Sequence, residues 1–600
     1  MNRTYRWITV AVGLVASSMA LAPLTMAAVP PFTTIGSYTA GTPQNNPFNV
    51  NWYMPEGSNR EPLAWTKNTA NPNAFWATAL ATHWKLSANG DNLTVWLRPQ
   101  AKWSNGAPVT AKDAAFTMAA EDVTGKNTWN LYSVTVVNPH EFILSMKPGT
   151  HYNLFENQAL QQNIEPQAAY PGILPSNIWT IIHESQYTGS NAARKALAAK
   201  AKTTISRLSN RLEAYEPAKD ISDGPFILTQ TSPSQQLMVK NPYFWGAKRI
   251  KINQVILYNL ISNQVGWNLM ESAKTDEATS AMPITVRNSA AHHPGNHFFA
   301  ISTYGIAELV FNQHVYPYNM TAVRQALAYL INRHNVGTVA APYAKHYPIK
   351  YFDGLSNGPS MHELTTKQLH ALNPYHPNPA KAAALLKSAG FHKNSAGHWL
   401  LPNGRPWTAA IYMAAGNSDW VEAGTVMAHE MTAFGIPTAT TPVSNATYAA
   451  EQLVGKYGMS FLFGEGGPQP FDAFNSYFTT ADGYSLIASH VQYSSSVAQN
   501  NWVNFPQTVG VKGYGKVKVG PLAYALEQTS NTATVKADTA KLAAATNQYV
   551  PMIPLFTEMV SGFYNTNFYT DWPVKNTAVM RGQFYFAPFF WMQMGYVHPR

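Results

Sequence analysis

Two short stretches of this sequence come close to the spacing of known catalytic motifs. The run from Gly510 to Lys516 has the spacing of a phosphate-binding P-loop, but Val517 stands where that loop needs a hydroxyl side chain to hold magnesium. His429 and Glu430 begin a zinc-protease pattern, but its second His is replaced by Ala433. The chain contains no Gly-x-Ser-x-Gly nucleophile elbow. We therefore expect no enzyme activity, no catalytic residues and no cofactor.

Cysteine and histidine give little support for a metal site. The sequence contains no cysteine, which excludes disulfides, Cys-type zinc sites, iron–sulfur clusters and the lipid-bearing Cys of a bacterial lipoprotein. His292, His293 and His297 gather in a stretch with Pro and Gly, which is more typical of solvent-facing side chains than of metal ligands. We therefore expect no bound metal.

The composition is that of a large folded protein. The chain has 600 residues, of which 46% are hydrophobic and only 12% are charged, against about 25% charged residues in an average soluble protein. Disorder is disfavoured because so much apolar surface can offset the entropy lost on ordering the chain. The net charge of +10 comes from 41 Lys and Arg against 31 Asp and Glu. It reflects scarce acids, so we expect no nucleic-acid partner.

One basic stretch, residues 183–216, stands out from this acid-poor background. Its residues 191–216 are rich in Ala and predict a helix. The basic residues of the helix are Arg194, Lys195, Lys200, Lys202, Arg207 and Arg211, against Glu213 and Glu216. A solvated helix face is the first interpretation, and a patch for a membrane or a partner protein is the alternative.

The first 28 residues indicate export. Two Arg lie within residues 2–6, a mostly apolar run follows over 7–22, and small residues occupy 25–28. This is the layout of a secretory signal peptide, with an uncleaved anchor helix as the alternative. In both cases the chain from about residue 29 lies outside the cytoplasm, in the periplasm or at the cell surface. No later stretch is apolar over about 18 uninterrupted residues, so the sequence does not predict an integral membrane protein.

The remaining sequence predicts a mixed α/β fold. Asn92 to Leu97 alternates as a strand does, and Thr110 is a plausible N-cap for a helix from Ala111 to Glu121. Residues 421–434 predict a helix that ends at Gly435, and the Pro-punctuated stretch 342–379 predicts irregular structure.

Residues 80–118 carry a recognisable combination of motifs. A strand ends in Leu97-Arg98, a turn follows at 103–106, and a helix start follows at 110–113. This order resembles the signature of the extracellular solute-binding proteins of family 5, the oligopeptide, dipeptide and nickel group, except that Asn105 replaces the usual Asp. Further stretches resemble the family in the same order along the chain: 61–63, 173–179, 223–226, 241–245, 309–312, 323–328, 378–390 and 551–555.

The resemblance implies a two-lobed periplasmic-binding-protein fold of type II, with a hinge and an extra domain inserted in the first lobe. It places a discontinuous lobe I at 29–62, 214–308 and 545–600, after a signal peptide at 1–28. The inserted small domain then covers 63–213, and lobe II covers 309–544. The basic stretch 183–216 departs from the family pattern as an insertion.

The same resemblance implies a function in uptake. Such a protein captures a solute between its lobes and delivers it to the permease of an ABC importer, and through the permease to the ATPase subunits. Binding favours the closed form because the ligand contacts both lobes only in that form. We expect a monomer.

Two main predictions can be made for the ligand. The resemblance places Glu465 where peptide binders of the family carry an Asp that pairs with the ligand's α-amino group; a solvated loop Glu is the alternative. Residues 415–420 instead resemble a Ser-Asp-Trp segment of family members that bind cello-oligosaccharides. For an oligosaccharide, Trp52, Trp420 and Trp502 could stack on sugar rings and Asp419 could accept from hydroxyls, although a core position is the usual one for any single Trp.

We therefore expect an oligopeptide-like solute first and an oligosaccharide second. The alternative from a different functional class is a secreted hydrolase or sensor domain with the same fold.

Overall fold

A computed structural model describes most of the chain beyond the leader. The described residues are 29–38, 45–49, 58–66, 76–125, 131–147, 155–344, 349–355, 363–453, 455–464, 470–478, 505–506, 508–529, 531–575, 577–582 and 587–600. The predicted signal peptide at 1–28 lies outside them.

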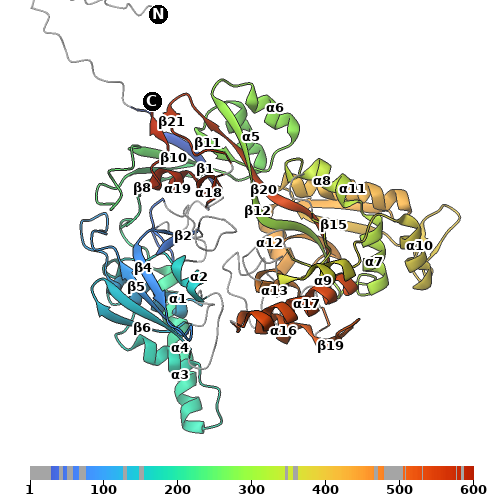
Figure 1. The fold of residues 1–600 in the computed structure, drawn as a ribbon, viewed down its shortest axis with the longest axis horizontal. Coiled ribbons are helices and arrows are strands. Elements are labelled where there is room, and N and C mark those ends of the chain that lie inside the picture. The colour runs from blue at the N-terminus through green and yellow to red at the C-terminus, as the bar shows by residue number, and fades with distance from the viewer. Residues whose placement is uncertain are drawn as a thin grey trace, which may run out of the picture.

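Two long antiparallel strands, β12 (Asn296–Phe311) and β20 (Met552–Asn565), run from one lobe into the other (Figure 1). At one end of the pair β20 also pairs with β11 (Glu277–Thr279). At the other end β12 pairs with β17 (Met459–Gly464). The two strands are therefore shared by both lobes, and the domain boundaries at 308/309 and 544/545 stay a prediction.

Lobe I contains a second sheet with the strand order β1-β10-β9-β8, in which β1 and β10 are parallel. Its core joins residues from both ends of the chain, such as Phe32, Phe226 and Trp591. Its elements are β1 (Phe32–Gly36), β8 (Phe226–Thr231), β9 (Gln235–Lys240), β10 (Gln254–Asn259), α5 (Asn263–Glu271), α6 (Ile284–Ala291), α18 (Ala578–Arg581), α19 (Ala587–Gln593) and the pair β21 (Tyr569–Thr570) and β22 (His598–Pro599).

The region predicted as the inserted domain holds an antiparallel sheet in the order β4-β5-β7-β6. In β5 every second residue is buried, which explains the strand alternation seen in the sequence. Thr110 and Asp113 form a capping box at the start of α1, as the predicted N-cap required. The elements are β4 (Ala81–Leu86), β5 (Asn92–Leu97), β6 (Leu131–Asn138), β7 (Glu141–Met146), α1 (Ala111–Val123), α2 (Phe155–Leu160), α3 (Ile178–Ser185), α4 (Ala192–Ala214) and the pair β2 (Ala64–Thr66) and β3 (Trp76–Thr78).

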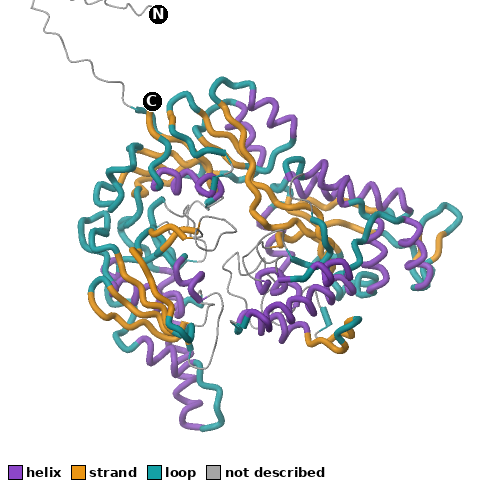
Figure 2. The backbone as a smooth tube through the Cα atoms, viewed as in Figure 1, coloured by secondary structure: helices purple, strands orange, loops and turns teal. Residues whose placement is uncertain are grey.

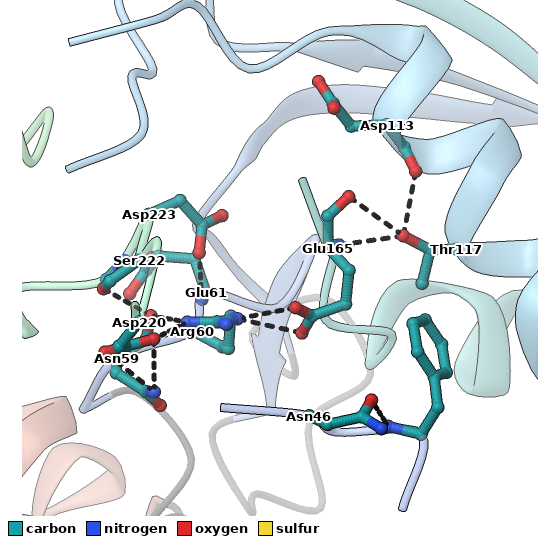
Figure 3. Close-up of polar contacts among 12 residues, drawn as sticks. Asn46, Asn59, Arg60, Glu61, Asp113, Thr117, Glu165, Asp220, Ser222 and Asp223 are labelled. Carbon is teal, nitrogen blue, oxygen red and sulfur yellow. Dashed lines mark hydrogen bonds and ion pairs between the residues drawn. The ribbon is translucent and has the colours of Figure 1, made fainter. Parts of the chain in front are cut away.

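A buried polar cluster joins this region to lobe I (Figure 3). The Arg60 guanidinium forms ion pairs with Glu165 and Asp220, each with an N–O distance of 2.8 Å. Asp220 also accepts from the backbone N–H of Leu228 in strand β8 of lobe I. The Thr117 hydroxyl of α1 accepts from the Glu165 N–H at 2.8 Å. The Arg60 cation thus connects three segments that are distant in sequence, and the Glu165 backbone connects them to α1.

Lobe II is built on a six-stranded sheet with the order β11-β20-β12-β17-β15-β16, with helices on both of its faces (Figure 2). α8 and α11 pack together on one face, and α7, α16 and α17 lie on the other (Figure 1). The remaining elements are β15 (Ala409–Ala414), β16 (Thr438–Val443), α7 (Thr321–Leu330), α8 (Arg333–Ala340), α9 (Thr366–Ala371), α10 (Pro379–Ser388), α11 (Ser418–Phe434), α12 (Asn445–Leu453), α13 (Pro470–Phe478), α16 (Val519–Glu527), α17 (Thr532–Tyr549), β13 (His392–Lys393) with β14 (Trp399–Leu400), and β18 (Thr508–Val511) with β19 (Gly515–Lys518).

Two predicted element boundaries need correction. Helix α11 begins at Ser418, three residues before the predicted start at 421, because the turn that follows β15 ends at Asn417, which is the N-cap of the helix. The stretch 342–379 is not wholly irregular, since Thr365 and Gln368 form a capping box at the start of the short helix α9.

Candidate functional site

The site begins where the pairing of β12 and β20 is interrupted. The register runs to Ser302 opposite Met559 and resumes with Ile306 opposite Thr557. Glu558 therefore lies opposite the three residues 303–305, at the passage between the lobes. An interruption of this kind re-aims side chains that a regular strand would point elsewhere.

A second carboxyl comes from the first turn of α11. Asp419 is 8% exposed, and the backbone N–H groups at the helix start favour its ionised form. The neighbouring Ser418 hydroxyl accepts from the Asn263 side chain of α5 at 2.9 Å. Asn263 in turn accepts from Ser280 at 2.9 Å. Contacts across the lobes thus hold the beginning of α11 in place.

Asp419 and Glu558 both line a small cavity of about 20 Å³, here called the carboxyl cavity. This space is large enough for about one water molecule or one ammonium group. Its walls come from the segment before α6, the segment after α8, the start of α11 and strand β20. The lining residues are Ala281, Met282, Ala340, Ala341, Pro342, Tyr343, Asp419, Phe556, Glu558, Met559 and Ser561.

Trp420 connects the cavity to the core of lobe II. Its indole ring stacks on Phe461, with centroids 5.4 Å apart and planes 11° from parallel. Its Nε1–H donates to Glu558 Oε1 at 3.4 Å. The residue is only 9% exposed. One face of its ring packs against protein, and its N–H group is hydrogen-bonded to the Glu558 carboxyl.

The acids of this region disfavour one another's charge. Burial raises the pKa of Asp419 to about 6. Burial, and then the nearby Asp419 carboxylate, raise the pKa of Glu558 well above its usual range, while the Trp420 N–H acts in the opposite direction. Burial and Asp419 also raise the pKa of Glu422 to about 7. Neighbouring carboxyls in a poorly solvated place cannot all ionise easily, so protons are retained near neutral pH.

Such a pair is suited to receiving a cation. Within the described ranges, neither Asp419 nor Glu558 forms an ion pair with Lys, Arg or His. A cationic group in the carboxyl cavity would favour the ionised form of both acids. Binding would then be accompanied by proton release.

The structure brings together two of the five predicted ligand-binding residues, Asp419 and Trp420. The other three, Trp52, Trp502 and Glu465, lie outside the described residues. The roles of all five stay predictions. Sequence reasoning missed Glu558, although one signal was present: it is a lone acid within the mostly buried strand β20.

The three predicted solvent-facing histidines lie together near the end of β20. His292 Nδ1 contacts the Asn288 carbonyl at 2.6 Å, and the His297 ring stacks on Tyr564. The described part of the chain contains no group of three His, Asp or Glu side chains arranged to hold a metal ion. None of its helices combines the length and apolar character needed to cross a membrane.

Comparison with known protein families identifies the family of this chain. The family model for bacterial extracellular solute-binding proteins, family 5 (middle), matches residues 76–485, which is more than half of the chain. The chain belongs to this family. It is a solute-binding protein of the kind that serves ABC importers, and the members of this family bind small ligands and are not enzymes.

Known relatives of this family 5 protein differ in their ligands. It is 22% identical to the nickel-binding periplasmic protein of Escherichia coli over 420 residues, which cover 66% of this chain and 69% of the relative. It resembles a NikZ structure from Campylobacter jejuni in complex with Ni(L-His), with a TM-score of 0.69, 15% identity, and 95% and 99% of the two chains covered.

A third neighbour is the periplasmic oligopeptide-binding protein of an ABC transporter from Thermotoga maritima with bound mannohexaose. The TM-score is 0.68 at 18% identity, with 96% of this chain and 100% of the neighbour covered. These likenesses confirm the two-lobed α/β fold. At such low identity they do not identify the solute that this family 5 protein binds.

Proposed function

We propose that this protein captures an oligopeptide-like solute between its two lobes and, as an exported monomer, delivers it to the permease of an ABC importer. The α-ammonium group of the peptide is held in the carboxyl cavity by Asp419 and Glu558. Glu465 is a further acid that contacts the ligand.

The observation that carries this proposal is the pair of carboxyls, Asp419 and Glu558, facing one small cavity without a cationic partner among the described residues. Buried charges are normally paired. The volume of about 20 Å³ suits an ammonium head and is far too small for a sugar ring or a whole side chain. The rest of the peptide must therefore extend away from the cavity.

The position of the cavity also supports a role in closure. Ala281 and Met282 lie beside α6 of lobe I, whereas Ala340 and Asp419 belong to helices of lobe II. A cation that interacts with Asp419 of lobe II and Glu558 of β20 occupies a space whose other walls come partly from lobe I, and so stabilises the arrangement in which those walls are close. The ligand thus shifts the population toward the closed form.

An oligosaccharide is the second candidate, and the mannohexaose in the Thermotoga maritima neighbour favours it. Stacking on a sugar needs an exposed aromatic face. Trp420 packs against both Phe461 and Tyr448 and is almost fully buried, so for a sugar ligand Trp52 and Trp502 would have to supply the stacking.

The first experiment is native mass spectrometry of the protein purified without unfolding, to weigh what copurifies with it. Adducts that fragment into amino-acid residues are expected. Adducts spaced by one hexose unit would overturn the peptide proposal and favour the sugar candidate.

The second experiment is calorimetric titration of D419N, E558Q and E465Q with a peptide identified in the first. Loss of one partner of a buried charge pair costs about 2 to 5 kcal/mol, so D419N and E558Q should weaken binding by at least about 30-fold. E184Q, in an exposed position on α3, is the matched control and should bind as the parent does. An N-acetylated peptide should lose the same affinity, and equal binding of both peptides would contradict the ammonium anchor.

A further inference from the structure

The helix α4 carries a large part of the charge of this protein. Its 23 residues hold six bases and one acid, Glu213, a net charge of +5 out of +10 for the whole chain. Figures 1 and 2 show α4 with α3 projecting from the body of the inserted region. Every residue from 192 to 197 is exposed, so the projecting end is the start of α4.

The fold itself makes little use of these bases. Arg194 and Lys195 lie in the first helical turn, which contains no acid, and cations at a helix N-terminus oppose the helix dipole. Arg194 packs over the Tyr187 ring, with 4.4 Å from its Cζ to the ring centroid. Among the described residues, none of the six bases forms an ion pair. The helix dipole therefore does not explain Arg194 and Lys195, and it favours only Arg211, which lies in the last turn.

Three of the six bases, Lys200, Arg207 and Arg211, lie along one side of the helix. Residues 197, 200, 204, 207 and 211 follow the alternating three- and four-residue spacing that places side chains on one face. This set, here called the α4 basic face, consists of Leu197, Lys200, Thr204, Arg207 and Arg211. The face extends for about 21 Å along the helix axis. The next residue after each of them, at 198, 201, 205, 208 and 212, is buried or half-buried against the body.

The exposed residues of the α4 basic face suit an extended anionic surface. The three bases Lys200, Arg207 and Arg211 are exposed, and Leu197 is 51% exposed at the projecting end. The face has no aromatic residue, whereas the centres of protein interfaces are enriched in aromatics and depleted of Lys. An anionic bilayer needs only a row of cations, and one exposed Leu can enter the boundary between headgroups and acyl chains.

We infer that the α4 basic face binds the anionic lipid headgroups of a membrane surface. The exported protein then lies with α4 along the bilayer on which its importer is located. Binding at this face is independent of the solute, because α4 projects from the inserted region whereas Asp419 lies at the start of α11 in lobe II (Figure 1). The contact is electrostatic and reversible, and salt weakens it.

Vesicle cosedimentation tests this inference with protein purified from the exported fraction. The vesicles contain phosphatidylcholine alone or with about 30% phosphatidylglycerol, at low and at high salt. Each base near an anionic surface contributes a factor of about five to partitioning. The triple variant K200Q/R207Q/R211Q should therefore bind the anionic vesicles about 100-fold more weakly than the parent. Neither protein should bind the neutral vesicles.

The matched control is K512Q/K516Q/K518Q, which removes the same charge from exposed positions on the β18 and β19 hairpin. It should partition within about twofold of the parent, since the hairpin is not on the proposed face. Equal losses in both triple variants would mean that net charge alone drives binding and would overturn the proposal, as would parent protein that ignores anionic vesicles.

One further experiment distinguishes a protein partner from a lipid surface. If parent protein binds permease-containing vesicles of neutral lipid, and the α4 triple variant does not, the face is a protein-docking surface and the lipid proposal is overturned. Leu197→Ser, with circular dichroism confirming an intact fold, should weaken binding to anionic vesicles by a few fold. Because this test contains no solute, its outcome is separate from that of the proposed peptide binding.

Discussion

Arg60 donates from Nε to both carboxylate oxygens of Glu165, at 2.8 and 3.0 Å, although 105 residues separate the two in sequence. The same guanidinium donates from Nη1 to Asp220 at 2.8 Å. All three side chains are almost fully buried. This triad ties the inserted region to lobe I, and its geometry leads to the first prediction.

Replacing Arg60 by Met should destabilise the protein by about 3 to 5 kcal/mol, because it leaves the Glu165 and Asp220 carboxylates buried without their cation. The free energy of unfolding in urea measures the loss. Lys541→Gln, which breaks the partly exposed pair with Asp538, is the control and should cost less than about 1 kcal/mol. Equal losses in the two variants would contradict a structural role of the triad.

A buried acid should make stability depend on pH. Burial raises the pKa of Glu277 to about 7 from an ordinary value of 4.5, although the Thr34 hydroxyl donates to it at 2.6 Å. The folded state then binds more protons than the unfolded state between about pH 4.5 and 7, so this group makes stability fall as pH rises through that window.

Glu277→Gln should remove that contribution, because the amide stays neutral at every pH. Relative to the parent, E277Q should gain about 3 kcal/mol between pH 4.5 and 8, measured by denaturant unfolding. The exposed Glu184→Gln should follow the parent profile. A constant difference between E277Q and the parent across this range would show that Glu277 does not titrate in the folded protein.

Trp420 should be needed for folding as well as for the site. Trp420→Ala removes a buried ring that stacks on Phe461 and should cost about 3 to 5 kcal/mol. Trp420→Phe keeps an aromatic ring beside Phe461 and loses the N–H donor to Glu558 together with part of the packed ring system, so it should cost less than the Ala variant, about 1 to 2 kcal/mol. Thermal unfolding and urea titration measure the free energy of unfolding of both variants. Loss of ligand in the Ala variant would therefore not by itself indicate sugar stacking.

Ligand binding should release protons near pH 6. Burial raises the pKa of Asp419 to about 6 and that of Glu558 well above its usual range. A bound ammonium favours the ionised carboxyls and lowers both values. The dissociation constant should thus increase as pH falls below about 6.

Calorimetry in two buffers with different ionisation enthalpies measures this release directly. The observed binding enthalpy of the parent should depend on the buffer, and that of the D419N/E558Q double variant should not. A buffer-independent enthalpy in the parent would argue against these acids as the anchor of the cation.

Much of the local structure could be predicted because its causes are local. The alternation of Asn92–Leu97 corresponds to alternating burial in β5, and Thr110 with Asp113 forms the predicted cap of α1. The start of α11 was predicted too late because Asn417 and Ser418 are also typical turn residues. Only packing against α5, through Asn263 and Ser418, decides between turn and helix there.

The candidate site was only half predictable. Asp419 and Trp420 are adjacent in the chain and were noticed together. Glu558 follows Trp420 by 138 residues and gave no motif, because its place beside Asp419 arises from the interruption in the β12 and β20 register.

The sequence by itself determined the family and some of the helices and strands, such as β5 and α1, and it predicted an export signal, since these depend on residue types at short spacing. Tertiary structure alone decided which acids meet in the carboxyl cavity and which side of α4 faces solvent. The physical reason is that burial and the electrostatic influence of one charge on another act through space. Residues such as Asp419 and Glu558 therefore acquire a common chemistry only when the chain has folded.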